Sequence, residues 1–107
     1  MAVSEISVDQ LAERLGQGAR LVDVREIAEY EGGHIPGARL VVLAEVPDNI
    51  SAFRGDGPTY VVCRSGARSM RACEFLAEHG VDAVNVAGGT MAWTLSGRDT
   101  VAGDSPS

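Results

Sequence analysis

Apolar positions along the chain gather into short runs that polar stretches and turns separate. The clearest run is TYVVC at 59–63, which is rich in β-branched and aromatic residues and follows the turn signal GDGP. Similar runs are RLVDVR at 20–25, RLVVL at 39–43 and DAVNVAGG at 82–89. The pattern therefore predicts four short buried strands.

Two of the segments between these runs carry clear helix signals. Ser7 and Gln10 have the form of a capping box, which predicts a short amphipathic helix ending near 16–18. Apolar residues at helical spacing predict a second helix from about 67 to 79, and Gly80 is a fitting C-terminal end.

Three further segments are expected to be helical over a shorter length. A turn or two of helix is expected over 26–33, and a last helix over 90–97. The segment 44–53 predicts a short or broken helix, because Pro47 is tolerated only in a first turn.

Strands that alternate with helices in this way indicate an α/β domain with a mainly parallel sheet. Ligands of such sheets bind beyond the carboxyl ends of the strands. Cys63 stands at one of these ends, where a loop leads into the helix predicted over 67–79. The position of this cysteine is thus typical of a functional residue.

Length and composition fit one globular domain, expected over 1–98 and followed by a frayed polar tail over 99–107. The net charge of −6 argues against nucleic acid or an anionic membrane as a partner. The segment 57–73 nevertheless has no Asp or Glu and holds three arginines around Cys63. All nine basic residues are Arg, which excludes a lysine Schiff base and a Walker-type phosphate loop.

Cysteine usage and the chain start bear on the compartment. Cys63 and Cys73 make neither a disulfide framework nor a complete zinc site, which favours a reducing compartment. The start MAVSEISVDQ lacks a signal pattern, and no apolar run approaches the roughly 18 residues of a membrane span. We therefore expect a cytoplasmic protein.

Cys63 is either a buried thiol or a nucleophile in an anion-binding loop. A free thiol is mostly protonated at neutral pH, so a nucleophile needs groups that lower its pKa. Nearby arginines, the following helix and backbone amides that Gly66 allows to point inward could do so. Cys is also among the residues most often buried. Cys73 lies on an apolar helix stripe and is expected in the core, with a resolving thiol as the alternative.

Three stretches carry a family resemblance: LVDVREIAEYEGGHIPGA at 21–38, YVVCRSGARS at 60–69 and VNVAGGTMAW at 84–93. In content and order they resemble the rhodanese family of sulfurtransferases. The resemblance implies a single rhodanese-like domain with a five-stranded sheet and helices on both faces. It also implies that Cys63 takes a sulfur atom from a donor, holds it as a persulfide and passes it to a thiol or another nucleophile.

The resemblance assigns roles to further residues. The persulfide and substrate would lie in a loop formed by Arg64, Ser65, Gly66, Ala67, Arg68 and Ser69. Arg64 and Arg68 would attract an anionic donor such as thiosulfate and stabilise the thiolate, although Arg68 could instead tie the loop down. Asp23 and Arg25 would support the loop without contacting substrate. The implied partners are a small sulfur donor and a thiol acceptor, with a protein persulfide as an alternative, and no metal or organic cofactor is implied.

Two rival functions remain open at this stage. The loop from Cys63 to Arg68 is of the form Cys-x4-Arg, whereas phosphatases and arsenate reductases of this fold resemble Cys-x5-Arg. The shorter loop disfavours a tetrahedral oxyanion, and Val62 stands where a phosphatase has His. The other rival is a rhodanese-like binding or regulatory module without turnover, which the intact cysteine loop disfavours.

The remaining motifs have structural explanations. His34 is expected to fix the turn at HIPGA, and AGGTMAW to pack the last helix with Trp93 as its anchor. Arg71 is expected on a solvated helix face. No special role is expected for the acidic residues Glu26, Glu29 and Glu31.

Overall fold

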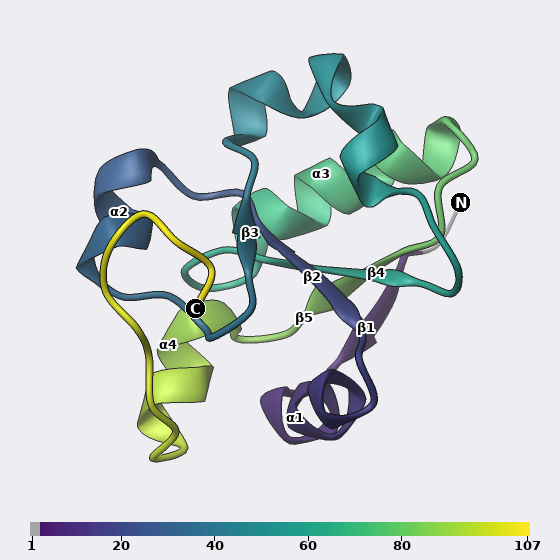
Figure 1. The fold of residues 1–107 in the computed structure, drawn as a ribbon. Helices are drawn as coiled ribbons and strands as arrows, with labels where there is room; N and C mark the ends of the chain where they lie inside the picture. The colour runs from purple at the N-terminus through teal and green to yellow at the C-terminus, as the bar shows by residue number, and fades with distance from the viewer. Residues whose placement is uncertain (1–2) are drawn as a thin grey trace.

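The computed structural model describes residues 3–107, and its centre is a five-stranded sheet with strand order β1-β5-β4-β2-β3. Every pairing in the sheet is parallel, so the predicted α/β class with a parallel sheet is confirmed (Figure 1). The strands are β1 (Ser4–Ile6), β2 (Arg20–Asp23), β3 (Arg39–Leu40), β4 (Thr59–Val62) and β5 (Ala83–Val86). β4 lies in the middle of the strand order, so the residue that follows it lies at the centre of the end of the sheet where the parallel strands terminate.

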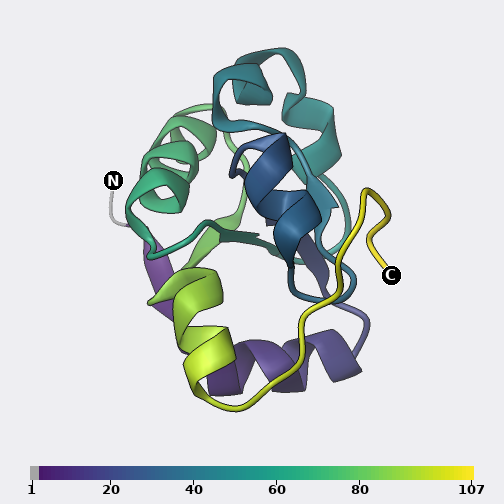
Figure 2. The same cartoon turned by 90° about the vertical axis from the view of Figure 1, so that its left-hand side faces the viewer.

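Helices cover both faces of the sheet (Figures 1 and 2). On one face lies α3, together with two 3₁₀ helices, and on the other lie α1 and α4, while α2 stands at one end of the sheet. Their bounds are α1 (Val8–Gly16), α2 (Ile27–Gly32), η1 (Leu43–Asp48), η2 (Ile50–Phe53), α3 (Ala67–Glu78) and α4 (Gly89–Leu95).

The two faces of the sheet bury separate apolar clusters, and β4 contributes to both. Val61 and Cys63 belong to the cluster beneath α3, whereas Tyr60 and Val62 belong to the cluster with α1, α4 and Trp93. This is the alternation expected of a strand that is covered on both faces. It directs the Cys63 side chain toward α3.

Local sequence signals set several element ends as predicted. The capping box is present, with the Ser7 hydroxyl accepting from the Gln10 amide and the Gln10 side chain accepting from the Ser7 amide. Helix α3 ends at Glu78, and Gly80 follows with φ of 75°, a left-handed conformation that glycine adopts readily. The predicted ends of α1 and α3 are therefore confirmed.

Other predictions need correction. Strand β1 is not predicted by the hydropathy pattern, because this edge strand is only three residues long and Ile6 is its one apolar residue. Pro47 lies inside η1 rather than in a first turn, since a 3₁₀ helix of six residues needs few backbone donors. The strand predicted over 39–43 is only two residues long, because η1 begins at Leu43.

The C-terminal tail (99–107) is not frayed, contrary to expectation. Val101 and His34 form an antiparallel bridge with N···O distances of 2.9 Å in both directions. The Gly103 amide donates to Glu31 O at 2.9 Å, and the Gly37 amide donates to Pro106 O at 2.8 Å. Backbone hydrogen bonds therefore hold this polar segment against the loop that follows α2, where Figure 2 shows it running along the molecule.

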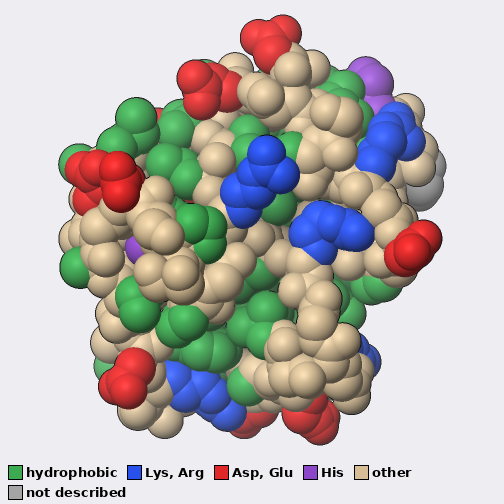
Figure 3. Space-filling view, in the orientation of Figure 1, with side chains coloured by type: hydrophobic (Ala, Val, Ile, Leu, Met, Phe, Trp, Pro, Cys, Tyr) green, Lys and Arg blue, Asp and Glu red, His purple; other side chains and the backbone are tan. Residues whose placement is uncertain are grey.

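The surface offers no continuous basic face in the view of Figure 3, where the blue arginine side chains are separated by tan and green surface. Within residues 3–107, no helix combines the length and apolar character that crossing a bilayer requires.

Candidate active site

Cys63 directly follows β4, and its sulfur lies in the turn that leads into α3. The Gly66 amide donates to Cys63 Sγ at 3.1 Å, and the Ser69 hydroxyl lies 3.3 Å from the same sulfur. Gly66 has φ of 107°, which a residue with a side chain rarely adopts. The glycine thereby permits the turn that brings donors to the sulfur.

Burial alone does not decide between the two interpretations of Cys63, since the residue is only 1% exposed. Burial by itself raises the pKa of the thiol, but the Ser69 hydroxyl and three loop amides outweigh it, so the pKa lies below its ordinary value. Backbone amides were one of the three sources expected from the sequence, and with the Ser69 hydroxyl they are the favourable effects on this pKa, whereas the expected arginines are not among them. The surroundings of Cys63 are thus those of a stabilised thiolate.

A chain of polar side chains extends from the sulfur to the molecular surface. Ser69 Oγ lies 2.5 Å from Asn85 Oδ1 on β5, and the Asn85 amide group donates to Glu5 Oε2 at 2.8 Å and to Gly66 O at 3.2 Å. Because Asn85 contacts both Ser69 and Gly66, it fixes two of the groups that surround Cys63 Sγ.

The start of α4 holds the backbone of the cysteine loop. Thr90 donates to Cys63 O from its amide at 2.9 Å and from its hydroxyl at 3.1 Å, and the Met91 amide donates to Arg64 O at 3.0 Å. A Cβ at Gly89 would lie 2.5 Å from Cys63 O and 2.6 Å from Arg64 O. The close packing expected of the stretch AGGTMAW is confirmed, and the segment that packs against its glycines is the Cys63 loop.

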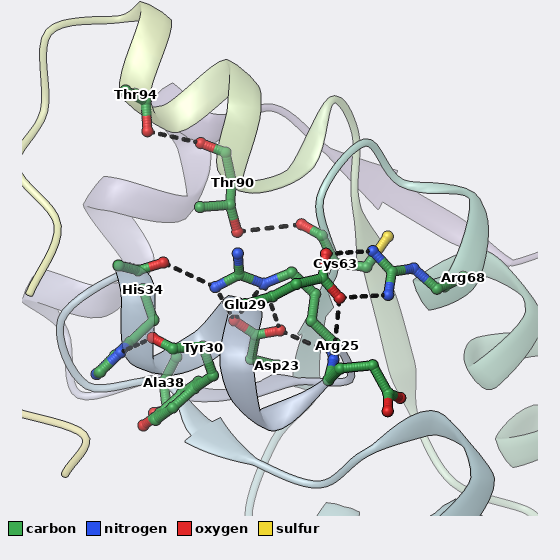
Figure 4. Close-up of polar contacts among 12 residues, drawn as sticks. Asp23, Arg25, Glu29, Tyr30, His34, Ala38, Cys63, Arg68, Thr90 and Thr94 are labelled. Atoms are coloured by element: carbon green, nitrogen blue, oxygen red, sulfur yellow. Dashed lines mark hydrogen bonds and ion pairs between the residues drawn. The ribbon is translucent and has the colours of Figure 1, made fainter. Parts of the chain in front are cut away.

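Arg68 forms a bidentate ion pair with Glu29 of α2, with N···O distances of 2.7 and 2.8 Å (Figure 4). The hydrogen bond with Arg68 lowers the pKa of Glu29 to about 2, against an opposing effect of burial. The expectation that Glu29 has no special role is therefore wrong. The pair ties the first turn of α3 to α2, as in the second of the two roles considered for Arg68.

Asp23 and Arg25 form a buried pair at the end of β2. Arg25 Nη2 donates to Asp23 Oδ2 at 2.8 Å and to Gly33 O at 2.9 Å, and Arg25 Nε donates to the same carboxylate at 3.0 Å. Within residues 3–107, no hydrogen bond of these two side chains reaches the Cys63 loop. They instead anchor the backbone after α2.

A cleft of about 610 Å³ opens beside the cysteine loop, between α2 and α4. It is lined by Arg25, Ala28, Glu29, Gly32, Gly33, Arg64, Thr90, Met91, Thr94 and Leu95. Arg64 belongs to both the loop and the cleft, so the cleft borders the loop that holds Cys63, although Cys63 itself is not a lining residue. In the region that the structure describes, no group of three or more His, Cys, Asp or Glu is placed to hold a metal ion.

The order of the motifs, the cysteine at the end of the central strand and the loop of backbone donors together match one known architecture. The family model described as a rhodanese-like domain matches residues 7–96. The chain belongs to the rhodanese family. Its predicted five-stranded rhodanese fold is thereby confirmed.

Several relatives of this rhodanese domain are named as sulfurtransferases. A sulfurtransferase of Allochromatium vinosum is 38% identical over 103 residues, which cover 94% of this chain and 96% of that protein. The thiosulfate sulfurtransferase GlpE of Pseudoalteromonas translucida is 33% identical, with coverage of 94% and 98%. The crystal structure of a rhodanese-like domain protein from Staphylococcus aureus is 39% identical with a TM-score of 0.80, and the match covers 85% of this chain and 91% of that one.

Residues outside the site of this rhodanese domain behave mostly as predicted. Cys73 is fully buried on the core-facing side of α3, and burial raises the pKa of its thiol to about 12, which confirms its place in the core. Arg71 is exposed, and Trp93 packs in the core cluster of α1 and α4. His34 is fully buried, with its ring nitrogens 2.8 Å from Tyr30 O and Ser105 O, so its role is structural.

Four residues of the site were not singled out for it by the sequence. They are Glu5, Glu29, Asn85 and Thr90, which come from four different elements or their boundaries. Glu29, Asn85 and Thr90 lie within the motifs that carry the family resemblance, and that is the one signal that could have drawn attention to them.

Proposed function

We propose that this protein is a sulfurtransferase in which Cys63 alternates between a thiolate and a persulfide. The observation that carries the proposal is the set of hydrogen bonds from Gly66 and Ser69 to Cys63 Sγ, with the lowered pKa that they produce. A nucleophilic sulfur must be ionised, and these donors stabilise the ionised form. The names of the relatives support the same class of reaction.

The first half of the reaction loads sulfur onto Cys63. With thiosulfate as donor, the thiolate attacks the outer sulfur, the bond between the two sulfurs of thiosulfate breaks, and sulfite leaves with the electron pair. The products are a Cys63 persulfide and sulfite, so atoms and charge balance without an oxidant. Loop amides that already surround an anionic sulfur suit a persulfide anion as well.

The second half returns the sulfur to an acceptor. A thiolate or cyanide attacks the outer sulfur of the persulfide, and the electron pair of the broken S–S bond returns to Cys63 Sγ. Arg64 is exposed at the loop and forms no ion pair among residues 3–107, so its charge is available to attract an anionic donor. Thiosulfate is the donor in the name of the relative GlpE.

The direct test combines mass spectrometry with a discharge assay. Incubation with thiosulfate should add one sulfur atom to the peptide that contains Cys63, and later addition of cyanide should release thiocyanate. Cys63→Ser should abolish both signals, whereas Cys73→Ala should keep them, because Cys73 is buried with an unreactive thiol.

The same experiment separates the rival functions. Absence of loading with thiosulfate and with organic persulfides would overturn the proposal and favour a binding module without turnover. Hydrolysis of an aryl phosphate that depends on Cys63 would favour a phosphatase.

The presence of only two cysteines, which form no disulfide framework, supports the cytoplasm as the compartment, where free thiols stay reduced.

A further inference from the structure

The cleft between α2 and α4 combines charged and apolar lining residues. Its volume of about 610 Å³ lies within the range of sites for small organic ligands. Such a volume far exceeds what one added sulfur atom needs. The space beside the Cys63 loop therefore suits a molecule larger than the transferred sulfur atom.

The charges around the cleft leave one cation without an internal partner. Glu29 is neutralised by Arg68, and Arg25 is paired with Asp23. Arg64 has no ion pair within residues 3–107 and lines the cleft next to the nucleophile. The net charge facing the cleft is thus positive and comes from Arg64 alone, so a single carboxylate would balance it.

Arg25 adds a donor that is already in place. Its guanidinium is held by Asp23 and by Gly33 O through Nε and Nη2, whereas Nη1 makes no hydrogen bond within residues 3–107. Figure 4 shows this guanidinium between Asp23 and Thr90, and Arg25 lines the cleft. A fixed N–H donor of this kind binds an anionic oxygen with little loss of side-chain entropy.

The α4 wall of the cleft is apolar and exposed. Met91 is 41% exposed and Leu95 is 81% exposed, and the two lie one turn apart on α4. Of the three large apolar side chains that are exposed among residues 3–107, these two line this cleft. An occupant with a hydrocarbon portion would cover them.

We propose that this cleft binds the organic part of the sulfur acceptor, and that the acceptor is a small thiol with an apolar chain and one carboxylate. Arg64 and Arg25 Nη1 bind the carboxylate of the acceptor, and its hydrocarbon chain packs against Met91 and Leu95. This proposal rests on the sulfurtransferase function proposed above, because it assigns the acceptor of that reaction.

The chemistry of the acceptor step needs no further reagent. The thiolate of the acceptor attacks the outer sulfur of the Cys63 persulfide and forms a new S–S bond. The bond to Cys63 Sγ breaks, its electron pair stays on Sγ, and the acceptor leaves as an organic persulfide. The loop then again holds the Cys63 thiolate.

The test compares three thiols of equal chain length: mercaptohexanoate, mercaptohexanol and mercaptohexylamine. Their thiol groups are far from the varied end group, so their intrinsic reactivities are similar. The protein is first loaded with thiosulfate and freed of excess donor, and discharge by each thiol is then followed by mass. We expect kcat/KM for mercaptohexanoate to exceed that for mercaptohexanol by about tenfold, the effect of one charge-assisted hydrogen bond, with mercaptohexylamine lowest.

Two variants locate the preference in the cleft. Leu95→Glu places a carboxylate on the α4 wall and should reduce the preference for mercaptohexanoate over mercaptohexanol to about threefold or less. Gln10→Glu changes the net charge equally, lies outside the cleft and preserves the capping box, so the preference should stay unchanged.

The outcomes are distinguishable. If Cys63 is loaded but the three thiols discharge it equally, or if Leu95→Glu leaves the preference intact, the acceptor proposal is wrong while the sulfurtransferase function stands. If the wild-type protein takes up no sulfur from thiosulfate or an organic persulfide, both proposals fail.

Discussion

Ser69 Oγ lies 3.3 Å from Cys63 Sγ and is the only side-chain oxygen within residues 3–107 that hydrogen-bonds to this sulfur. The serine stands in the first turn of α3 and is fully buried. Its distance to Asn85 Oδ1 is shorter, at 2.5 Å, and a hydroxyl has one proton to donate. Gly66 O lies 3.2 Å from the same hydroxyl, so the Cys63 sulfur, Asn85 Oδ1 and Gly66 O compete for one proton.

Ser69→Ala should slow the loading of sulfur at neutral pH. The Ser69 hydroxyl lowers the pKa of Cys63, so its removal raises that pKa and moves the rise of the loading rate to higher pH. Loss of one hydrogen bond to an anion corresponds to a roughly tenfold lower rate below the pKa. The measurement is the pH profile of sulfur loading. Ser65→Ala is the matched control, because residue 65 acts through its amide; an unchanged profile in Ser69→Ala would contradict the interpretation.

Glu29→Gln should reduce stability by about 1 kcal/mol or less at pH 7, because about a third of each side chain of the pair is exposed. The pKa of Glu29 is lowered from 4.5 to about 2. A lowered carboxyl pKa contributes stability above pH 4.5, and this contribution is lost as the pH falls from 4.5 through 2. Urea unfolding at several pH values should show a smaller acid-induced loss in the variant than in wild type. Equal pH dependence in both proteins would show that the pair contributes nothing.

Gly89→Ala should both destabilise the protein and impair sulfur loading. The added Cβ would meet Cys63 O at 2.5 Å, and the residue has φ of 62°. We expect a loss of about 2 kcal/mol or more, since steric overlap adds to the cost of the left-handed conformation. Gly97→Ala is the control, because Gly97 has φ of 87° but no atom within 4 Å of its Cβ position. Thermal unfolding and loading should separate the two variants, with loading impaired in Gly89→Ala alone.

Asp23→Asn should be the most destabilising of these substitutions. Asp23 is fully buried and binds Arg25 through several hydrogen bonds, so the change leaves a buried guanidinium without its counter-charge. The expected loss is about 3 kcal/mol or more. Asp9→Asn breaks the exposed pair with Arg98, where the Asp9 side chain is 78% exposed, and should cost at most about 1 kcal/mol. Similar losses for both variants in denaturant unfolding would contradict the prediction.

Local patterns were enough to predict the strands around β4 and the place of Cys63 between a strand and a helix. The capping box of Ser7 and Gln10 and the end of α3 near Gly80 are also local, since the partners lie within a few residues. Secondary structure of this kind depends on neighbours in sequence, so the order of residues is sufficient to indicate it.

The contacts of the site could not be predicted in the same way. Arg68 and Glu29 are 39 residues apart, and Asn85 and Glu5 are 80 apart, so only the folded sheet brings them together. The contacts of the C-terminal tail use backbone groups, which hydropathy does not distinguish. The acidic residues around Glu29 are alike in sequence, and nothing but the position of Arg68 sets one of them apart.

The alternation along β4 has a consequence for how the protein can fail. Because Val61 and Cys63 face α3 while Tyr60 and Val62 face the opposite cluster, a slip of one residue in the strand would turn the nucleophile to the wrong side of the sheet. Such a slip would also expose the wrong apolar residues, so a molecule with a misplaced Cys63 is unfolded rather than merely inactive. Substitutions of the apolar β4 residues Tyr60 and Val62, whose side chains point away from the Cys63 side chain, should therefore lower the number of folded molecules in a preparation and leave the turnover of each folded one unchanged.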